Sequence, residues 1–212
     1  MTGYTLDQIF IGTPRALPEG SPSAIYKHDV TRRIAVEHAG LAGDAQADPD
    51  NHGGPERALH HYPAEHYGFW QARLSPAEPF VPGVLGENLS IAGLTEADVH
   101  VGDVFTLGTT RLQISQPRWP CWKPGDRLAI KPMAHELIEH GRAGWFYRVL
   151  QTGDIAPGDT LTRVAAAEHG ITLARLWALK NTRAPDAQMR EEIDFMTSYD
   201  RLAPAWQDRL RG

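Results

Sequence analysis

Short stretches of alternating apolar and polar residues run through the first two-thirds of the chain. In residues 110–115, Leu112 and Ile114 alternate with polar side chains, which is the period of a half-buried strand. Glycines and prolines separate such stretches and cut this region into short segments. The pattern predicts strands over residues 33–37, 58–62, 89–91, 104–107, 110–115, 145–151 and 160–164.

Helical spacing interrupts this region twice. After Pro63, the apolar residues 67, 70 and 74 share one helical face, and proline suits a first helical position. A second helix is predicted to open at Pro132 and to end at Gly141. Beyond about Val164 the pattern becomes helical, with helices beginning at Thr172, Asp186 and Pro204.

We therefore expect a mainly β protein with some α structure. Repeated turns before strands favour a β-barrel with peripheral helices over alternating βαβ units. The predicted division is a barrel domain over residues 1–165 and a three-helix extension over residues 166–212. Because the extension is too small to have much core of its own, we expect it to pack on the barrel or on a second subunit.

Composition narrows the class of protein. With 212 residues and 42% hydrophobic residues, the chain is neither a disordered tail nor a collagen. A net charge of −5 without long basic runs argues against nucleic acid and membrane surfaces as partners. The chain shows no targeting pattern and no apolar run of membrane-spanning length, so we expect a cytoplasmic protein. A single cysteine, Cys121, excludes an intrachain disulfide.

The first stretch that can carry chemistry covers residues 43–57 and is glycine-rich. His52, Gly53 and Gly54 precede Pro55, and Arg57 follows at the start of a predicted strand. Glycines let backbone N–H groups approach an anion, and Arg57 can add a charge-assisted contact. The same residues are also typical of a tight surface turn.

Histidines cluster at positions 52, 60, 61 and 66, which raises the idea of a zinc site. The spacing argues against it, because Pro63 breaks any helix that would bring 61 and 66 to one face. His135 and His140 are five residues apart, about 140° around a helix, and cannot easily share a metal. Solvated or hydrogen-bonded histidines are the alternative.

Strand alternation separates the candidate proton donors. It places Arg57 and His61 on one face and His60 and Tyr62 on the other, and only one face can line a site. Half-buried, hydrogen-bonded side chains are an equal alternative.

Further along, Glu87 and Asn88 lie between Gly86 and an apolar residue. They can bind the amide edge of a heterocycle or hold a neighbouring loop.

The most informative stretch surrounds the cysteine. A predicted strand leads into a loop with three prolines, where Cys121 lies close in sequence to Arg118 and Lys123. Nearby cations lower a thiol pKa, and the thiolate is both a nucleophile and a ligand for soft metals. A packing cysteine is more often found within a strand among aliphatic residues, so a functional Cys121 is favoured.

Three of these stretches, in this order, resemble the MOSC domain, which is named after the C-terminal part of molybdenum-cofactor sulfurase. They are residues 52–57, 86–89 and 116–121. Residues 62–67 and the helical tail are similar to the YiiM-type branch of that family. The resemblance covers essentially the whole chain and implies a MOSC-type β-barrel that binds the molybdenum cofactor, a pterin dithiolene carrying a phosphate.

The resemblance also implies roles for residues. Cys121 matches the protein ligand to molybdenum and is the expected catalytic centre. We expect the cofactor site to include His52, Gly53, Gly54, Arg57, Tyr62, Asn88, Arg118 and Lys123, and the catalytic residues to include His60, His61 and Glu87.

Members of the YiiM type are linked to the reduction of N-hydroxylated compounds, such as 6-hydroxylaminopurine, to amines. Because the chain lacks iron–sulfur cysteines and a dinucleotide fingerprint, a flavoprotein or a ferredoxin-like protein is the expected external electron donor. A homodimer is compatible with the sequence. The alternatives are a cofactor carrier and a sulfur-transfer protein that uses Cys121.

Overall fold

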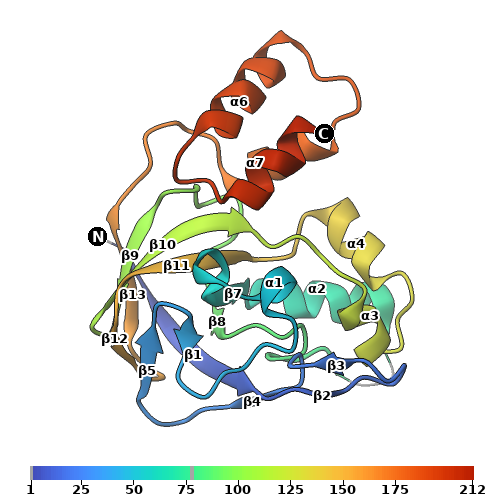
Figure 1. The fold of residues 1–212 in the computed structure, drawn as a ribbon, viewed down its shortest axis with the longest axis vertical. Coiled ribbons are helices and arrows are strands. Elements are labelled where there is room, and N and C mark those ends of the chain that lie inside the picture. Colours follow the sequence, from blue (N-terminus) through green and yellow to red (C-terminus); the bar gives the residue numbers. More distant parts are fainter. Residues whose placement is uncertain (1, 77–78) are drawn as a thin grey trace.

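A closed β-barrel forms the centre of the computed structural model, which describes residues 2–76 and 79–212 (Figure 1). Within these residues, seven strands follow the order β13-β9-β10-β11-β7-β8-β1, and β1 pairs with β13 to close the ring. Neighbouring strands are antiparallel except β7 and β8, which are parallel. The barrel strands are β1 (Gly3–Gly12), β7 (Leu59–Pro63), β8 (Leu89–Ile91), β9 (Val104–Leu107), β10 (Thr110–Pro117), β11 (Trp145–Gln151) and β13 (Thr160–Ala165).

Smaller strands flank the barrel. Strand β4 (Lys27–Asp29) pairs with the end of β1. A small sheet contains β12 (Gly153–Ile155), β5 (Ile34–Glu37) and β6 (Gly40–Leu41), and β2 (Arg15–Ala16) pairs with β3 (Pro22–Ser23).

All seven strands that the sequence predicts are present: six belong to the barrel, and the one over residues 33–37 is β5. The seventh barrel strand, β1, was not predicted from the sequence pattern. Its register shifts between Leu6 and Gln8, and Ile9, Phe10 and Ile11 are buried in succession. Such a bulge and two-sided burial remove the alternation by which a half-buried strand is recognised. The strand predicted from residue 58 begins at Leu59, because the preceding residues form a short 3₁₀ helix, η1 (Pro55–Arg57).

The helices cover one side and one end of the barrel (Figure 1). Gly141 ends α4 in a left-handed conformation, and the side chains of Thr172 and Asp186 cap α5 and α6, all as predicted. The helices are α1 (Pro49–His52), α2 (Glu65–Leu74), α3 (Lys123–Arg127), α4 (Met133–His140), α5 (Leu173–Asn181), α6 (Ala187–Ser198) and α7 (Pro204–Arg211).

Pro63 does not occupy a first helical position, so that prediction is wrong. It is the last residue of β7, where it pairs with Ile91 of β8, and α2 begins at Glu65. The backbone N–H of Ala64 bonds to the carbonyl oxygen of Ile91, so the strand pairing reaches past Pro63 before the helix can start.

The C-terminal helices share the core of the barrel. Trp177, Met196 and Trp206 belong to the same buried apolar cluster as the barrel residues Phe105 and Tyr147. Burial of large aromatic side chains is the main stabilising contribution at this junction. The extension therefore packs on the barrel. No helix of the described residues is long and apolar enough to cross a membrane.

Candidate functional site

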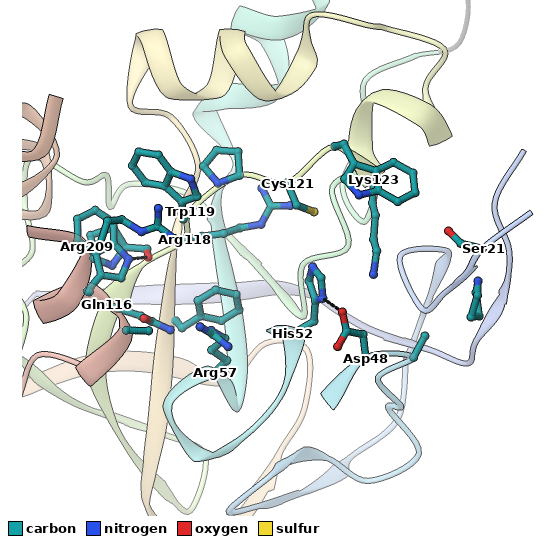
Figure 2. A pocket seen from close by; sticks show the side chains of 18 residues that line it. Ser21, Asp48, His52, Arg57, Gln116, Arg118, Trp119, Cys121, Lys123 and Arg209 are labelled. Atoms are coloured by element: carbon teal, nitrogen blue, oxygen red, sulfur yellow. Dashed lines mark hydrogen bonds and ion pairs between the residues drawn. The ribbon is translucent and has the colours of Figure 1, made fainter. Parts of the chain in front are cut away.

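A cavity opens beside Cys121 between the rim of the barrel and α7 (Figure 2). It has a large lobe of about 610 Å³ and a small lobe of about 100 Å³. Residues of α7 line only the large lobe, and Lys27, Asp44, His60 and Asn88 line only the small one. Both lobes are lined by Ala47, Asp48, His52, Arg57, Arg118, Cys121, Lys123 and Phe146.

A bulge at the end of β10 directs the chain toward this cavity. The pairing of β10 with β11 shifts register between Ile114 and Gln116, which leaves Ser115 unpaired in the ladder. Bulges of this kind re-aim the following side chains. Gln116 then lines the large lobe, and the backbone N–H of Arg118 bonds to the carbonyl oxygen of Gly144 at 3.0 Å. The loop to Cys121 is held in this way.

The thiol of Cys121 is half-buried and strongly influenced by its neighbours. Burial raises its pKa, but a hydrogen bond with His52, the charge of Arg118 and the backbone N–H of Lys123 together outweigh this effect. The pKa of the thiol is lowered to about 7. A thiol with this pKa is largely thiolate just above neutral pH. It is suited both to nucleophilic attack and to binding a soft metal.

One turn of helix places Asp48 behind His52. The Nδ1 atom of His52 lies 3.2 Å from Oδ2 of Asp48, and the backbone N–H of His52 bonds to the carbonyl oxygen of Asp48. Residues four apart share a helical face, which explains this contact. A carboxylate on Nδ1 fixes the tautomer and the orientation of the ring, so Nε2 is the nitrogen that faces away from Asp48.

Arg57 is brought into the cavity by η1 rather than by a strand. The carbonyl oxygen of Glu56 accepts a hydrogen bond of 2.6 Å from Ser115, and its carboxylate is paired with the guanidinium of Arg148 on β11. These contacts hold η1 on the barrel. Arg57 therefore lines the cavity although His61, which strand alternation placed on the same face, does not.

Arg118 reaches the centre of the cavity with its charge incompletely paired. The residue is 7% exposed, and Nη2 donates a long hydrogen bond of 3.4 Å to the carbonyl oxygen of Leu85. Nη1 is buried and has no hydrogen-bond partner among the described residues. A buried donor without a partner is costly, and an anion in the cavity would satisfy this guanidinium.

His60 and Asn88 line the small lobe, and both form hydrogen bonds within the protein. Nε2 of His60 donates to the carbonyl oxygen of Ala143 at 3.1 Å, and burial together with the charge of Arg118 holds its pKa well below the usual range. The imidazole is therefore neutral. The Asn88 amide donates to Asp44 at 2.8 Å and accepts from the backbone of His60 at 3.0 Å.

Three other predicted residues lie away from the cavity. The ring of His61 stacks on Trp145 inside the barrel, and burial lowers its pKa to about 3. The Tyr62 hydroxyl donates to the carbonyl oxygen of Arg142 and accepts from Trp70. The Glu87 carboxylate accepts from the N–H groups of Gly83 and Leu85 and from the Tyr67 hydroxyl. Their contacts hold the barrel and the loop after Phe80 in place.

Gly53 and Gly54 shape the turn but do not line either lobe. Gly54 has φ +87°, and a Cβ on Gly53 would lie 3.0 Å from the backbone carbonyl oxygen of Pro49. Only glycine meets both requirements at low cost. The two glycines therefore allow the chain to pass from His52 to Arg57, and those two side chains reach the cavity.

The histidine cluster does not converge on one point. His52 and His60 line the cavity, His61 lies in the barrel, and His66 pairs with Glu96 at 2.7 Å. His135, Glu136 and Glu139 lie close together on α4, but Glu136 is paired with Arg73.

Sequence reasoning missed several residues of the cavity. Asp48 was not considered, although its spacing of four from His52 was a usable signal. The ion pair of Lys27 with Asp44, at 2.6 Å, joins distant segments and had no local signal. Arg209 lines the large lobe from α7, and only the docking of the extension brings it there.

The fold and the cavity together define a class of protein: a β-barrel whose rim carries a low-pKa thiol among cationic side chains. The MOSC domain model matches residues 48–162. Protein YiiM from Escherichia coli is 44% identical over 167 residues, covering 76% of this chain and 74% of that protein. A protein named Reductase from Gibberella moniliformis is 40% identical over 192 residues, 89% of this chain but 34% of that protein.

The structural comparison agrees with these matches. The crystal structure of YiiM from Geobacillus stearothermophilus has a TM-score of 0.81 and 28% sequence identity, covering 98% of this chain and 97% of that chain. The chain belongs to the MOSC domain family, as its motifs predicted.

Proposed function

We propose that this protein binds the molybdenum cofactor in the cavity beside Cys121 and reduces N-hydroxylated compounds to amines. The observation that carries the proposal is that the same cavity contains a thiol of pKa about 7, on Cys121, and the buried guanidinium of Arg118. Membership of the MOSC family and the similarity to a protein named Reductase support the same chemistry.

The residues of the cavity fit the cofactor. Its phosphate requires cations, and Arg57, Arg118 and Lys123 line both lobes. The buried Nη1 of Arg118, without a partner among the described residues, is satisfied once an anion binds. A thiolate is a soft ligand, as a molybdenum centre requires. When bound, the cofactor supplies a metal that exchanges two electrons and so permits cleavage of an N–O bond.

The chain's own residues then have separable roles. Cys121 would hold the metal, and His52, oriented by Asp48, keeps the thiol in its reactive form and position. His60 is neutral and its one proton is donated to Ala143, so it serves as a hydrogen-bond acceptor toward the small lobe. His52 and Lys123, which line both lobes, can deliver protons. An external flavoprotein or ferredoxin-like protein would supply the electrons.

Metal and pterin analysis tests the proposal. Protein purified from a host that makes the cofactor should contain molybdenum and pterin, and it should reduce 6-hydroxylaminopurine with an artificial electron donor. The Cys121→Ser variant should lose this activity, and protein from a host unable to make the cofactor is the control. Absence of molybdenum from the wild-type protein, or full activity of Cys121→Ser, would contradict the proposal.

The second candidate function is sulfur transfer, which one observation favours, and cofactor carriage is the remaining alternative. The series Asp48, His52 and Cys121 is the arrangement that activates a nucleophilic cysteine in hydrolases and transferases. The same preparation distinguishes the functions: bound cofactor without any reduction of hydroxylamino compounds favours carriage, and a persulfide on Cys121 detected by mass spectrometry favours sulfur transfer.

A further inference from the structure

The large lobe has a cationic wall to which a helix outside the segment that matches the MOSC model contributes. Arg209, Trp206 and Ala205 of α7 line this lobe, whereas the matched segment ends at residue 162. Arg57 from η1 lines the same lobe, and Figure 2 shows both guanidinium side chains on the side of the cavity that faces α7. Two distant parts of the chain thus bring positive charge to one place.

Arg209 is held in this position by packing. Its guanidinium carbon lies 4.2 Å from the centroid of the Trp119 ring, a cation–π distance. Burial and the nearby charge of Arg57 lower the pKa of Arg209, but a guanidinium stays charged at neutral pH. Arg57 and Arg209 carry like charges in a half-buried site and repel one another. Both guanidinium groups would attract an anion bound between them.

A buried amide completes the same wall. Gln116 is 2% exposed and lines the large lobe, and its Oε1 atom has no hydrogen-bond partner among the described residues. Trp206 and Phe146 line the lobe beside it, and the Trp206 N–H is already bonded to the carbonyl oxygen of Pro117. The wall therefore offers aromatic surface, one unsatisfied amide and two guanidinium groups. These are the features that recognise a nucleotide.

We propose that Arg209 and Gln116 form, beside Arg57, a subsite for the phosphate and sugar of a nucleotide substrate, so that the site prefers N-hydroxylated nucleoside monophosphates to the free bases. The inference rests on the proposed function. The phosphate of the cofactor has the same chemistry, but its expected partners Arg57, Arg118 and Lys123 all lie within the matched segment. Arg209 lies on α7, outside that segment, and we therefore assign it to binding of the substrate phosphate rather than the cofactor phosphate.

The test compares phosphorylated and unphosphorylated ligands on the cofactor-loaded protein. Calorimetry with adenosine monophosphate and with adenosine measures binding without turnover, and the KM values of the N-hydroxylated nucleotide and nucleoside measure it in the reaction. For wild type we expect about tenfold tighter binding of each phosphorylated ligand. Arg209→Gln should abolish this preference at unchanged pterin content, and Arg209→Lys should keep part of it.

Arg211→Gln is the matched control. Arg211 lies on the same helix, is exposed and pairs with Asp208. It should leave the preference unchanged. Equal binding of adenosine and its monophosphate by wild type would overturn the inference, as would a loss of pterin from Arg209→Gln, which would assign Arg209 to the cofactor. Phosphate-dependent binding that requires Arg209, without any reduction of N-hydroxylated compounds, would support this subsite and contradict the proposed reductase.

Discussion

His52 lowers the pKa of the Cys121 thiol, although the two residues come from α1 and from the loop after β10. Its influence is the largest of those that lower this pKa, and Asp48 holds the His52 ring through Nδ1. Because Cys121 is the one cysteine of the chain, its reactivity can be measured without interference.

The first prediction concerns that contact. In cofactor-free protein, the rate of alkylation of Cys121 by iodoacetamide should rise with a midpoint near pH 7, because the thiolate forms as pH increases through the pKa. His52→Ala should move the midpoint upward by about one pH unit, since burial then dominates. His135→Ala, an exposed histidine on α4, should leave it unchanged. Equal midpoints for wild type and His52→Ala would show that the hydrogen bond has no effect.

Arg118 provides the second prediction. Arg118→Met removes a buried charge at similar volume, so retention of pterin should fall about tenfold or more. The melting temperature of the cofactor-free protein should stay the same or rise, because this charge is poorly compensated there. Arg111→Met, at an exposed position of β10, is the control for both measurements. A marked loss of stability in Arg118→Met would assign this arginine a structural role.

Glu87 should prove to be structural. Glu87→Ala would leave the N–H groups of Gly83 and Leu85 and the Tyr67 hydroxyl without their acceptor. The free energy of unfolding in urea should fall by about 3 kcal/mol or more, since each buried donor left unpaired costs about 1–3 kcal/mol. Glu139→Ala, at an exposed position of α4, should change it by less than about 0.5 kcal/mol. An unchanged stability with loss of turnover would instead indicate a catalytic Glu87.

Two glycines allow a paired test of backbone strain. Gly144 has φ +74°, and a Cβ there would lie 2.2 Å from the carbonyl oxygen of His61. Gly144→Ala should therefore lower the melting temperature strongly or prevent folding. Gly68 lies within α2 with no atom within 4 Å of an added Cβ, so Gly68→Ala should raise stability by about 0.5–1 kcal/mol. Thermal unfolding followed by circular dichroism compares the two.

Much of the fold was predictable because its signals are local. The strands at residues 89–91, 104–107 and 145–151 match β8, β9 and β11 in their bounds, and Thr172 and Asp186 cap the helices they precede. Alternation and capping depend on neighbours within a few residues. Strand β1 was not predictable in this way, since its burial on both faces is decided by β8, β4 and β13.

The candidate site shows the same difference between features with a local sequence signal and features that depend on distant segments. Arg118, Cys121 and Lys123 are close in sequence, so a thiol among cations was visible in the chain itself. That His60 lines the cavity while His61 stacks on Trp145 depends on which face of β7 turns toward the barrel interior. Tyr62 and Glu87 are engaged by Trp70 and Tyr67, partners that packing brings to them.

Residue type, spacing and motif order were enough to identify the MOSC family and the reactive cysteine, because they are properties of the chain alone. The His52 contact that lowers the pKa of Cys121, the incomplete pairing of Arg118 and the arrival of Arg209 from α7 required the closed barrel with its docked extension. Charge, burial and hydrogen bonding act over a few ångströms in space, and that proximity exists only once distant segments have packed together.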